Sequence, residues 1–319
     1  MSNSVKNELK IQNSTVKNIF QIIIDFSSKN PIIFFMSILS LFIVILYSYP
    51  WKNYSIQSGD INIALGNFLL FEDGKLINDK QFNIYSDMLY DQLDLFQEEL
   101  EQERGLIVDL RSSDEIPSFT SSSIVNMTNK AVAYAQKINA DILLYGYIEN
   151  TIYGIEIHPY IYLNEAKFGD IWEVVGDHKL GSVLYERTNN ILDINGRLLS
   201  RKITCLAKLI YPLSEYIVGN YEIAINGYEG LLEADCQQII PTDLLFILIG
   251  NAYSRTDNLD CAESFYVNAL QYNPSYCRGY LGLAGIHYLV AYDSTKIGDL
   301  QVALQEIKMT KENLNKAMT

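Results

Sequence analysis

Residues 131–163 read AVAYAQKINADILLYGYIENTIYGIEIHPYIYL, and their apolar spacing changes from the period of a helix to that of a strand. Ala131, Ala135 and Ile138 recur at steps of four and three, which places them on one face of a helix. Residues 142–147 and 155–163 follow as two apolar, β-branched and aromatic runs, separated by a short polar stretch. This segment therefore predicts a helix followed by a β-hairpin.

The second run of the hairpin has two different faces, because successive side chains of a strand point to opposite sides of the sheet. One face carries Ile155, Ile157, Ile161 and Leu163, and the other carries Glu156, His158, Tyr160 and Tyr162. We expect the second face to contact solvent. An acid/base pair of Glu156 and His158 is conceivable there, but a solvated polar face is the expected reading.

The segment upstream completes a small α/β domain over residues 58–186. Ile61, Ile63 and Leu65 alternate as in a strand that ends at the turn 72–74, and residues 106–110 are apolar like a short buried strand. Between them, apolar residues at steps of three and four mark a helix: Tyr85, Leu89, Leu93, Phe96 and Leu100. The predicted order is β-α-β-α-β-β, which requires a mixed sheet with helical crossovers.

This order resembles the amino-terminal domain type of TolB, which also occurs in flagellar outer-membrane assembly proteins and in bacterial repeat proteins. The resemblance rests on a helix followed by a strand of the type Ala-Asp-apolar-apolar-x-Gly, here Ala140, Asp141, Ile142, Leu143 and Gly146. It implies an assembly or sensing module, and it offers no active-site residues.

Residues 190–319 carry a helical-repeat pattern. In a 34-residue frame that starts at Asp243, eight positions match the repeat signature: Phe246, Ile249, Gly250, Tyr253, Ala262, Tyr266, Ala269 and Pro274. This segment resembles a tetratricopeptide repeat (TPR), which is a hairpin of two helices. Gly250 and Ala262 allow close approach of the two helices, and Pro274 ends the second helix.

Two degenerate repeats flank this frame. Upstream, Gly219, Tyr221, Ala224 and Tyr228 are similar to the second helix of a repeat; downstream, Tyr280, Leu283 and Ala284 are in register from Cys277. In the downstream repeat we expect an insertion at 293–298 to delay the second helix until residues 299–314. So short a stack needs capping by the α/β domain or by another subunit.

The TPR resemblance implies a groove that contacts a peptide or a partner helix. The family's groove positions correspond here to Leu244, Ile247, Asn251, Ser254, Arg255, Arg278 and Leu281. Asn251 matches the asparagine that grips peptide in some members, whereas the lysines of chaperone-type clamps are absent. The alternative is that this face packs against the protein's own α/β domain.

Residues 31–51, PIIFFMSILSLFIVILYSYPW, contain no charged residue and are long enough to cross a bilayer as a helix. We predict an uncleaved signal-anchor after a leader at 1–30; a cleaved signal peptide or a buried helix fits less well. The leader contains Lys6, Lys10, Lys17 and Lys29, which favours a cytoplasmic amino terminus with the rest of the chain outside.

The four cysteines argue against a position outside the cytoplasm. Cys205, Cys236, Cys261 and Cys277 fall in segments predicted to be helical and lack the spacing of a zinc or redox site. Pairing would have three possible connectivities, but repeat geometry suggests no pair within bridging distance. We therefore expect core thiols, which argues against export to an oxidising compartment.

The remaining chemistry argues for binding rather than catalysis. A net charge of -14 argues against nucleic acid as a partner. His158, His178 and His287 are dispersed, and no catalytic or phosphate-binding motif occurs, so that we expect no enzyme activity, cofactor or metal. Asp170, Glu173 and Asp177 could bind a cation but are more simply an acidic loop.

The sequence thus predicts an α+β multidomain protein with one transmembrane helix, a mixed-sheet domain and a carboxyl-terminal helical module. The expected function is that of a bacterial membrane-anchored scaffold or adaptor that binds a protein or peptide partner, with homo-oligomerisation as a further option. The alternative is a ligand-sensing or envelope-assembly protein whose α/β domain binds a small molecule or an envelope component.

Overall fold

The computed structural model describes residues 55–152, 154–169, 171–186, 196–234 and 236–319. The leader at 1–30 and the predicted span at 31–51 lie outside these residues. Within the part of the chain that the structure describes, none of the helices combines the length and the apolar character needed to cross a bilayer. Residues Ser55–Thr319 form one compact unit.

A mixed sheet organises the first half of this unit, as predicted. Strand β1 (Ile61–Glu72) pairs in parallel with β4 (Ile142–Thr151), which forms an antiparallel hairpin with β5 (Gly154–Leu163). The short strands extend the two sides of this trio: β3 (Val108–Arg111) is parallel and β2 (Lys75–Ile77) antiparallel to β1, and β6 (Gly176–Lys179) and β7 (Val183–Glu186) are antiparallel to β5.

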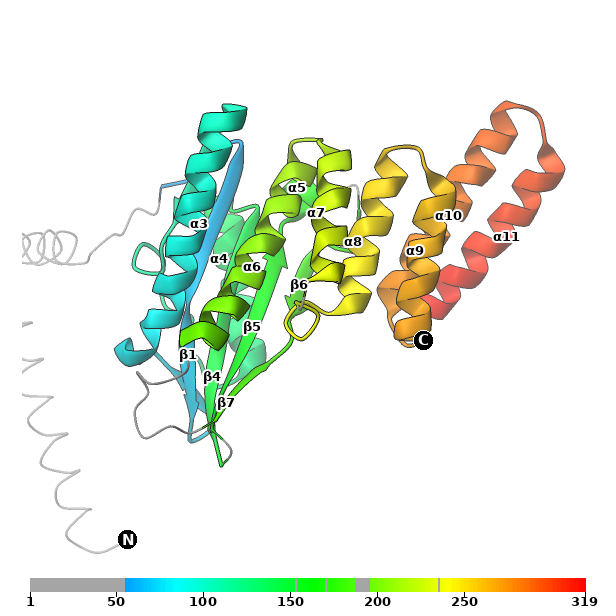
Figure 1. The fold of residues 1–319 in the computed structure, drawn as a ribbon. Coiled ribbons are helices and arrows are strands. Elements are labelled where there is room, and N and C mark those ends of the chain that lie inside the picture. The colour runs from blue at the N-terminus through cyan, green and yellow to red at the C-terminus, as the bar shows by residue number, and fades with distance from the viewer. Residues whose placement is uncertain (1–54, 153, 170, 187–195, 235) are drawn as a thin grey trace, which may run out of the picture. The chain divides into compact units, whose positions relative to one another are not determined.

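Helices cover both faces of the sheet (Figure 1). Helices α3 (Asn83–Arg104) and α6 (Gly196–Ile217) lie on one face, and α4 (Ile124–Ile138) lies on the other. Two short helices complete this part, the 3-10 helix η1 (Lys80–Phe82) and α5 (Glu165–Phe168). The predicted order β-α-β-α-β-β is therefore present, with the additional short strands at the edges.

The expectation of a solvated second face on β5 is wrong. His158, Tyr160 and Tyr162 are all buried on that face. The His158 ring stacks on Tyr147 of the neighbouring strand with 4.4 Å between ring centroids, and the Tyr162 hydroxyl accepts a hydrogen bond from Gln136 of α4. Aromatic rings and α4 thus exclude water from a face whose alternation of polar residues suggested exposure.

The Ala-Asp pattern has a structural reason. Asp141 is fully buried at the start of β4, and its Oδ2 accepts hydrogen bonds from both the backbone N and the Nδ2 of Asn62 in β1. Burial raises the pKa of the Asp141 carboxyl to about 6. This side chain fixes the parallel register of the two central strands.

The second half consists of helices that pair in succession. Helix α6 pairs with α7 (Tyr221–Glu233), α8 (Thr242–Arg255) with α9 (Leu259–Tyr272), and α10 (Cys277–Lys296) with α11 (Leu300–Ala317). The expected insertion at 293–298 extends α10 to Lys296 before the turn into α11. Since α3 also packs on α6, a row of contacting helices runs from α3 to α11 (Figure 1).

The sheet and the helices share one hydrophobic core, which continues across the predicted domain boundary near residue 190. Leu209 and Leu213 of α6 are fully buried in the same apolar cluster as Leu89 of α3 and Ile148 of β4. Phe96 and Tyr211 add an edge-to-face aromatic contact between α3 and α6. The first helix of the helical half is thus also a layer of the α/β half.

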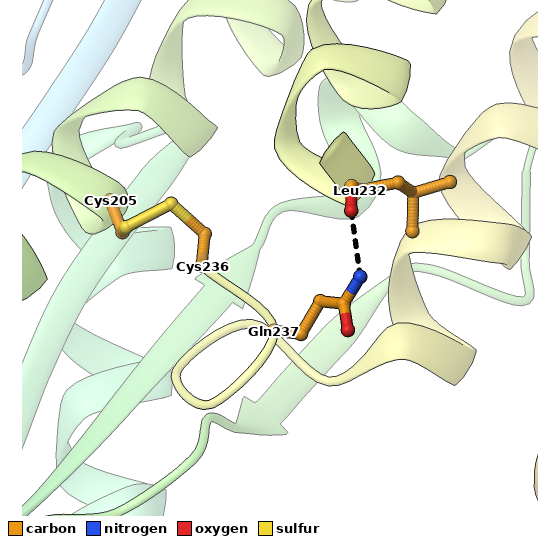
Figure 2. Close-up of a disulfide and its surroundings, with 4 residues drawn as sticks. All are labelled: Cys205, Leu232, Cys236 and Gln237. Carbon is orange, nitrogen blue, oxygen red and sulfur yellow. Dashed lines mark hydrogen bonds between the residues drawn. A yellow bond between two sulfur atoms is a disulfide. The ribbon is translucent and has the colours of Figure 1, made fainter. Parts of the chain in front are cut away.

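The expectation that the cysteines remain unpaired is wrong for two of them. Cys205 of α6 forms a disulfide with Cys236, at a Cα–Cα distance of 5.5 Å (Figure 2). Cys236 lies beyond the end of α7 in the connection to α8, not in a helix, and this connection turns back toward α6. Gln237 of the same connection donates to the Leu232 carbonyl (Figure 2), and Gly181 donates to the Ile239 carbonyl. Cys261 and Cys277 are free.

Candidate functional site

A groove of about 690 Å³ lies where the α/β half meets the helical half. Residues 171–173, from the connection between α5 and β6, form one wall. Residues of α8 together with residues 281–286 of α10 line the part here called the floor, and Tyr288, Leu289, Thr310 and Leu314 of α10 and α11 make up a second wall. The site is therefore built from elements that are far apart in the sequence.

Two glycines shape the floor around Tyr266 of α9. A Cβ atom on Gly250 of α8 would lie 2.8 Å from the Tyr266 ring, and one on Gly282 of α10 would lie 2.5 Å from it. Both distances are too short for real atoms, so the ring fits between α8 and α10 because neither position carries a side chain. The Tyr266 hydroxyl reaches Glu173 Oε1 at 3.3 Å, and burial raises its pKa well above the ordinary value, so it stays protonated.

Asn251 places an unsatisfied hydrogen-bond donor at this floor. The side chain is 1% exposed, and its Oδ1 accepts a hydrogen bond from the Tyr266 hydroxyl. Its Nδ2 has no hydrogen-bond partner among the described residues, and Asn251 lines the groove. Leaving a buried donor unpaired costs about 1–3 kcal/mol. An acceptor atom of a bound molecule would recover that free energy once a small movement of the Asn251 side chain opens Nδ2 to the groove, because this atom is itself buried.

The walls are apolar and aromatic. Trp172 is 75% exposed and Tyr288 is 61% exposed, and both line the groove together with Leu289 and Leu314. At the rim, Arg255 lies over the Tyr221 ring, 5.4 Å from its centroid, and donates to the Tyr221 hydroxyl. An open groove with aromatic walls and polar side chains from α8 suits an extended segment that offers apolar side chains and backbone carbonyls.

Four of the seven predicted groove residues do line this site: Asn251, Ser254, Arg255 and Leu281. Leu244 and Ile247 instead lie in the core, 3% and 0% exposed, so we do not retain them as groove residues. Arg278 donates to the backbone carbonyls of Glu173 and Val175 at 2.6 and 3.1 Å. At Arg278, the predicted groove face of the helical module packs against the α/β half. This is the alternative stated in the sequence analysis.

The TPR pattern did not predict four of the wall residues, which are Trp172, Glu173, Tyr288 and Leu314. Trp172 and Glu173 belong to the acidic segment considered for a cation. In the structure, Asp177 of that segment accepts a hydrogen bond from the Tyr145 hydroxyl, and Glu173 faces Tyr266. Asp170 is not among the described residues. In the described ranges, no group of acidic, histidine or cysteine side chains is arranged to hold a metal ion.

His158, the histidine considered for an acid/base pair, lies in a cluster of its own in the α/β half. His158 Nε2 lies 3.8 Å from carboxylate oxygens of both Glu149 and Glu156, and burial lowers its pKa. The hollow of about 340 Å³ in this half lies elsewhere, over Ser121, Asn126 and Lys130. The His158 cluster and this hollow are thus separate features.

No protein-family model matches the chain, and a search of curated proteins returned no significant match. The groove is therefore the feature from which we infer a function.

Proposed function

We propose that this protein is an adaptor that captures a peptide segment of a partner protein in the groove between residues 171–173 and helices α8, α10 and α11. The observation that carries the proposal is the buried Asn251, whose Nδ2 lacks a partner at the floor of an open, aromatic-walled groove. A small movement of Asn251 on binding would let a backbone carbonyl of the partner accept from the buried Nδ2, and an apolar side chain of the partner would pack beside Trp172 and Tyr288.

Two family relations are part of this proposal. The pairing of α6–α11 into three successive hairpins within the described chain, and the seat of Tyr266 between two helical glycines, support a TPR-like module. The Asp141–Asn62 link between parallel strands supports the TolB-like reading of residues 58–186. Tyr266 is thus the packing residue that supports the TPR-like module, and Asp141 is the buried residue that supports the TolB-like domain.

We further propose that residues 31–51 anchor the chain in a membrane, with the body that begins at Ser55 outside the cytoplasm. The lysines of the leader favour this orientation. The Cys205–Cys236 disulfide supports it independently, because disulfides persist in oxidising compartments and are rare in the cytosol. The lysines of the leader and the disulfide therefore both favour a body outside the cytoplasm, whereas in the sequence alone the cysteines argued against export.

A peptide-display selection against the full chain in detergent tests the capture proposal. We expect enrichment of peptides with an apolar anchor, and Trp172→Ala should weaken their binding by about tenfold or more, because a well-packed aromatic anchor contributes about 2 kcal/mol. Ile152→Ala is the matched control, since Ile152 is 84% exposed on the β4–β5 turn. Selected peptides that bind both variants as tightly as the original protein would place the site elsewhere.

The ligand-sensing alternative would need a buried pocket with converging polar groups in the α/β half. The hollow over Ser121, Asn126 and Lys130 is lined by exposed and half-buried side chains. We favour the adaptor because aromatic side chains and the buried Asn251 line the groove of the helical half.

A further inference from the structure

Helix α10 contains a glycine that its own packing does not explain. Gly285 lies in the interior of this helix, where glycine is among the least favourable residues. A Cβ atom on Gly282, one turn earlier, would overlap the Tyr266 ring, whereas a Cβ atom on Gly285 would meet no atom within 4 Å. Gly282 therefore has a packing role. Gly285 is exposed, lines the groove and has no such role among the described residues.

The absent side chain leaves a hole in the groove surface of α10. Residues at positions i, i+3, i+4 and i+7 of a helix enclose a hole that can receive one side chain of a bound segment. Here these four residues are Leu281, Ala284, Gly285 and Tyr288, and all of them line the groove. Two of the four carry no more than a methyl group, so the hole is deep, and Leu281 and Tyr288 give it apolar sides.

Asn251 of α8 points independently to a bound molecule in the same groove. The side chain is 1% exposed, and its Nδ2 has no partner among the described residues. Tyr266 connects this side chain to α10, because its hydroxyl donates to Asn251 and its ring fills the space that a side chain at Gly282 would need. A segment that reaches Asn251 therefore passes the surface of α10 that contains the hole.

We propose, on the basis of the peptide capture proposed above, that the hole at Gly285 selects the captured segment by the size of one apolar anchor residue. A leucine, methionine or phenylalanine side chain of the partner fills the hole between Leu281 and Tyr288, while the partner's backbone lies beside Asn251. A methyl group at position 285 would occupy the same space. Gly285 is thus a specificity-determining residue of the groove.

Gly285→Ala separates this role from a structural one, because its effects on folding and on binding have opposite signs. In the free protein, alanine favours the helix and meets no neighbour, so the variant should unfold at a higher temperature than the original. In the complex, the new methyl group overlaps the anchor. Peptides selected on the original protein should therefore bind the variant at least about tenfold more weakly, as expected for one extra carbon in an apolar pocket.

The test is a pair of peptide selections, on the original protein and on Gly285→Ala, with the full chain in detergent. We expect large apolar anchors from the first selection and smaller anchors, such as valine or alanine, from the second. Affinities of one peptide from each selection for both proteins then complete the exchange. Gly230→Ala is the matched control: Gly230 is exposed in α7, its Cβ would meet no atom within 4 Å, and it does not line the groove. This control should gain stability and bind peptide like the original.

Three results would overturn the proposal. Equal affinity of Gly285→Ala and the original for a selected peptide would show that the hole is empty in the complex; if Trp172→Ala still weakens that peptide, capture in the groove stands without the hole. Anchors of the same size from both selections would show that position 285 does not read anchor size. A selection on the original protein that enriches no peptide would contradict capture itself, and the role of Gly285 with it.

Discussion

Single residues decide whether the groove floor can form, and Tyr266 shows how. Its ring occupies the space that side chains at Gly250 and Gly282 would need, and its hydroxyl orients Asn251. The repeat signature predicts Gly250 and Tyr266, because close helix packing demands a small residue opposite a large one. It does not predict the role of Gly282, which lies in the degenerate repeat.

Gly282→Ala should lower the free energy of unfolding by about 1–3 kcal/mol, because the new methyl group overlaps the buried Tyr266 ring. Gly285→Ala on the same helix is the matched control: its Cβ meets no atom within 4 Å, so the higher helix propensity of alanine should stabilise by up to about 1 kcal/mol. Urea denaturation of both variants measures the difference. Equal effects of the two substitutions would contradict the packing of Tyr266.

His178 gives the body a dependence on pH. Its Nε2 lies 2.6 Å from the Val174 carbonyl, and burial, with Arg278 nearby, lowers its pKa from 6.5 to about 3. The unfolded chain therefore binds a proton that the folded chain rejects, so stability is complete above pH 6.5 and falls as the pH drops toward 3. Between pH 7.5 and 5 this group should cost about 2 kcal/mol.

His178→Gln keeps a donor for the Val174 carbonyl but does not titrate. Unfolding of both proteins at pH 5 and 7.5 isolates the contribution of His178, since other groups titrate equally in each. A pH dependence that is unchanged by the substitution would show that His178 is accessible to protons in the folded state.

At the scale of elements, the disulfide joins parts that the hydrogen-bond pattern also joins. It connects α6 to the connection before α8, and this connection bonds to Gly181 after β6. Periodicity predicts the helices and the central strands, because each buries one regular stripe. It cannot predict the disulfide, because Cys236 lies in an irregular connection whose path depends on contacts with the α/β half.

Replacement of both Cys205 and Cys236 by serine should lower the free energy of unfolding by about 3–4 kcal/mol, as expected for a cross-link over 31 residues. Cys261→Ser is the control, because Cys261 is a free thiol. Denaturation with and without reductant checks the same quantity in the unchanged protein. A loss below about 1 kcal/mol would mean that the connection is held mainly by its other contacts.

At the scale of the whole molecule, the candidate site exists only because two halves share a core. Arg278 reaches the Glu173 carbonyl across 105 residues of sequence, and this contact brings Trp172 to the groove. The repeat frame predicted Asn251, Ser254, Arg255 and Leu281, because helix register fixes which residues face inward. It could not predict Trp172, since no local pattern encodes a contact between such distant segments.

A bound segment should satisfy the hydrogen-bonding capacity of Asn251, and titration calorimetry with one selected peptide measures this. Asn251→Asp keeps the acceptor for Tyr266 but replaces the Nδ2 donor with an oxygen, so the peptide's carbonyl would face an acceptor. We predict that affinity falls at least about tenfold while the variant still unfolds cooperatively. Unchanged affinity in a folded Asn251→Asp protein would show that Nδ2 does not bind the peptide.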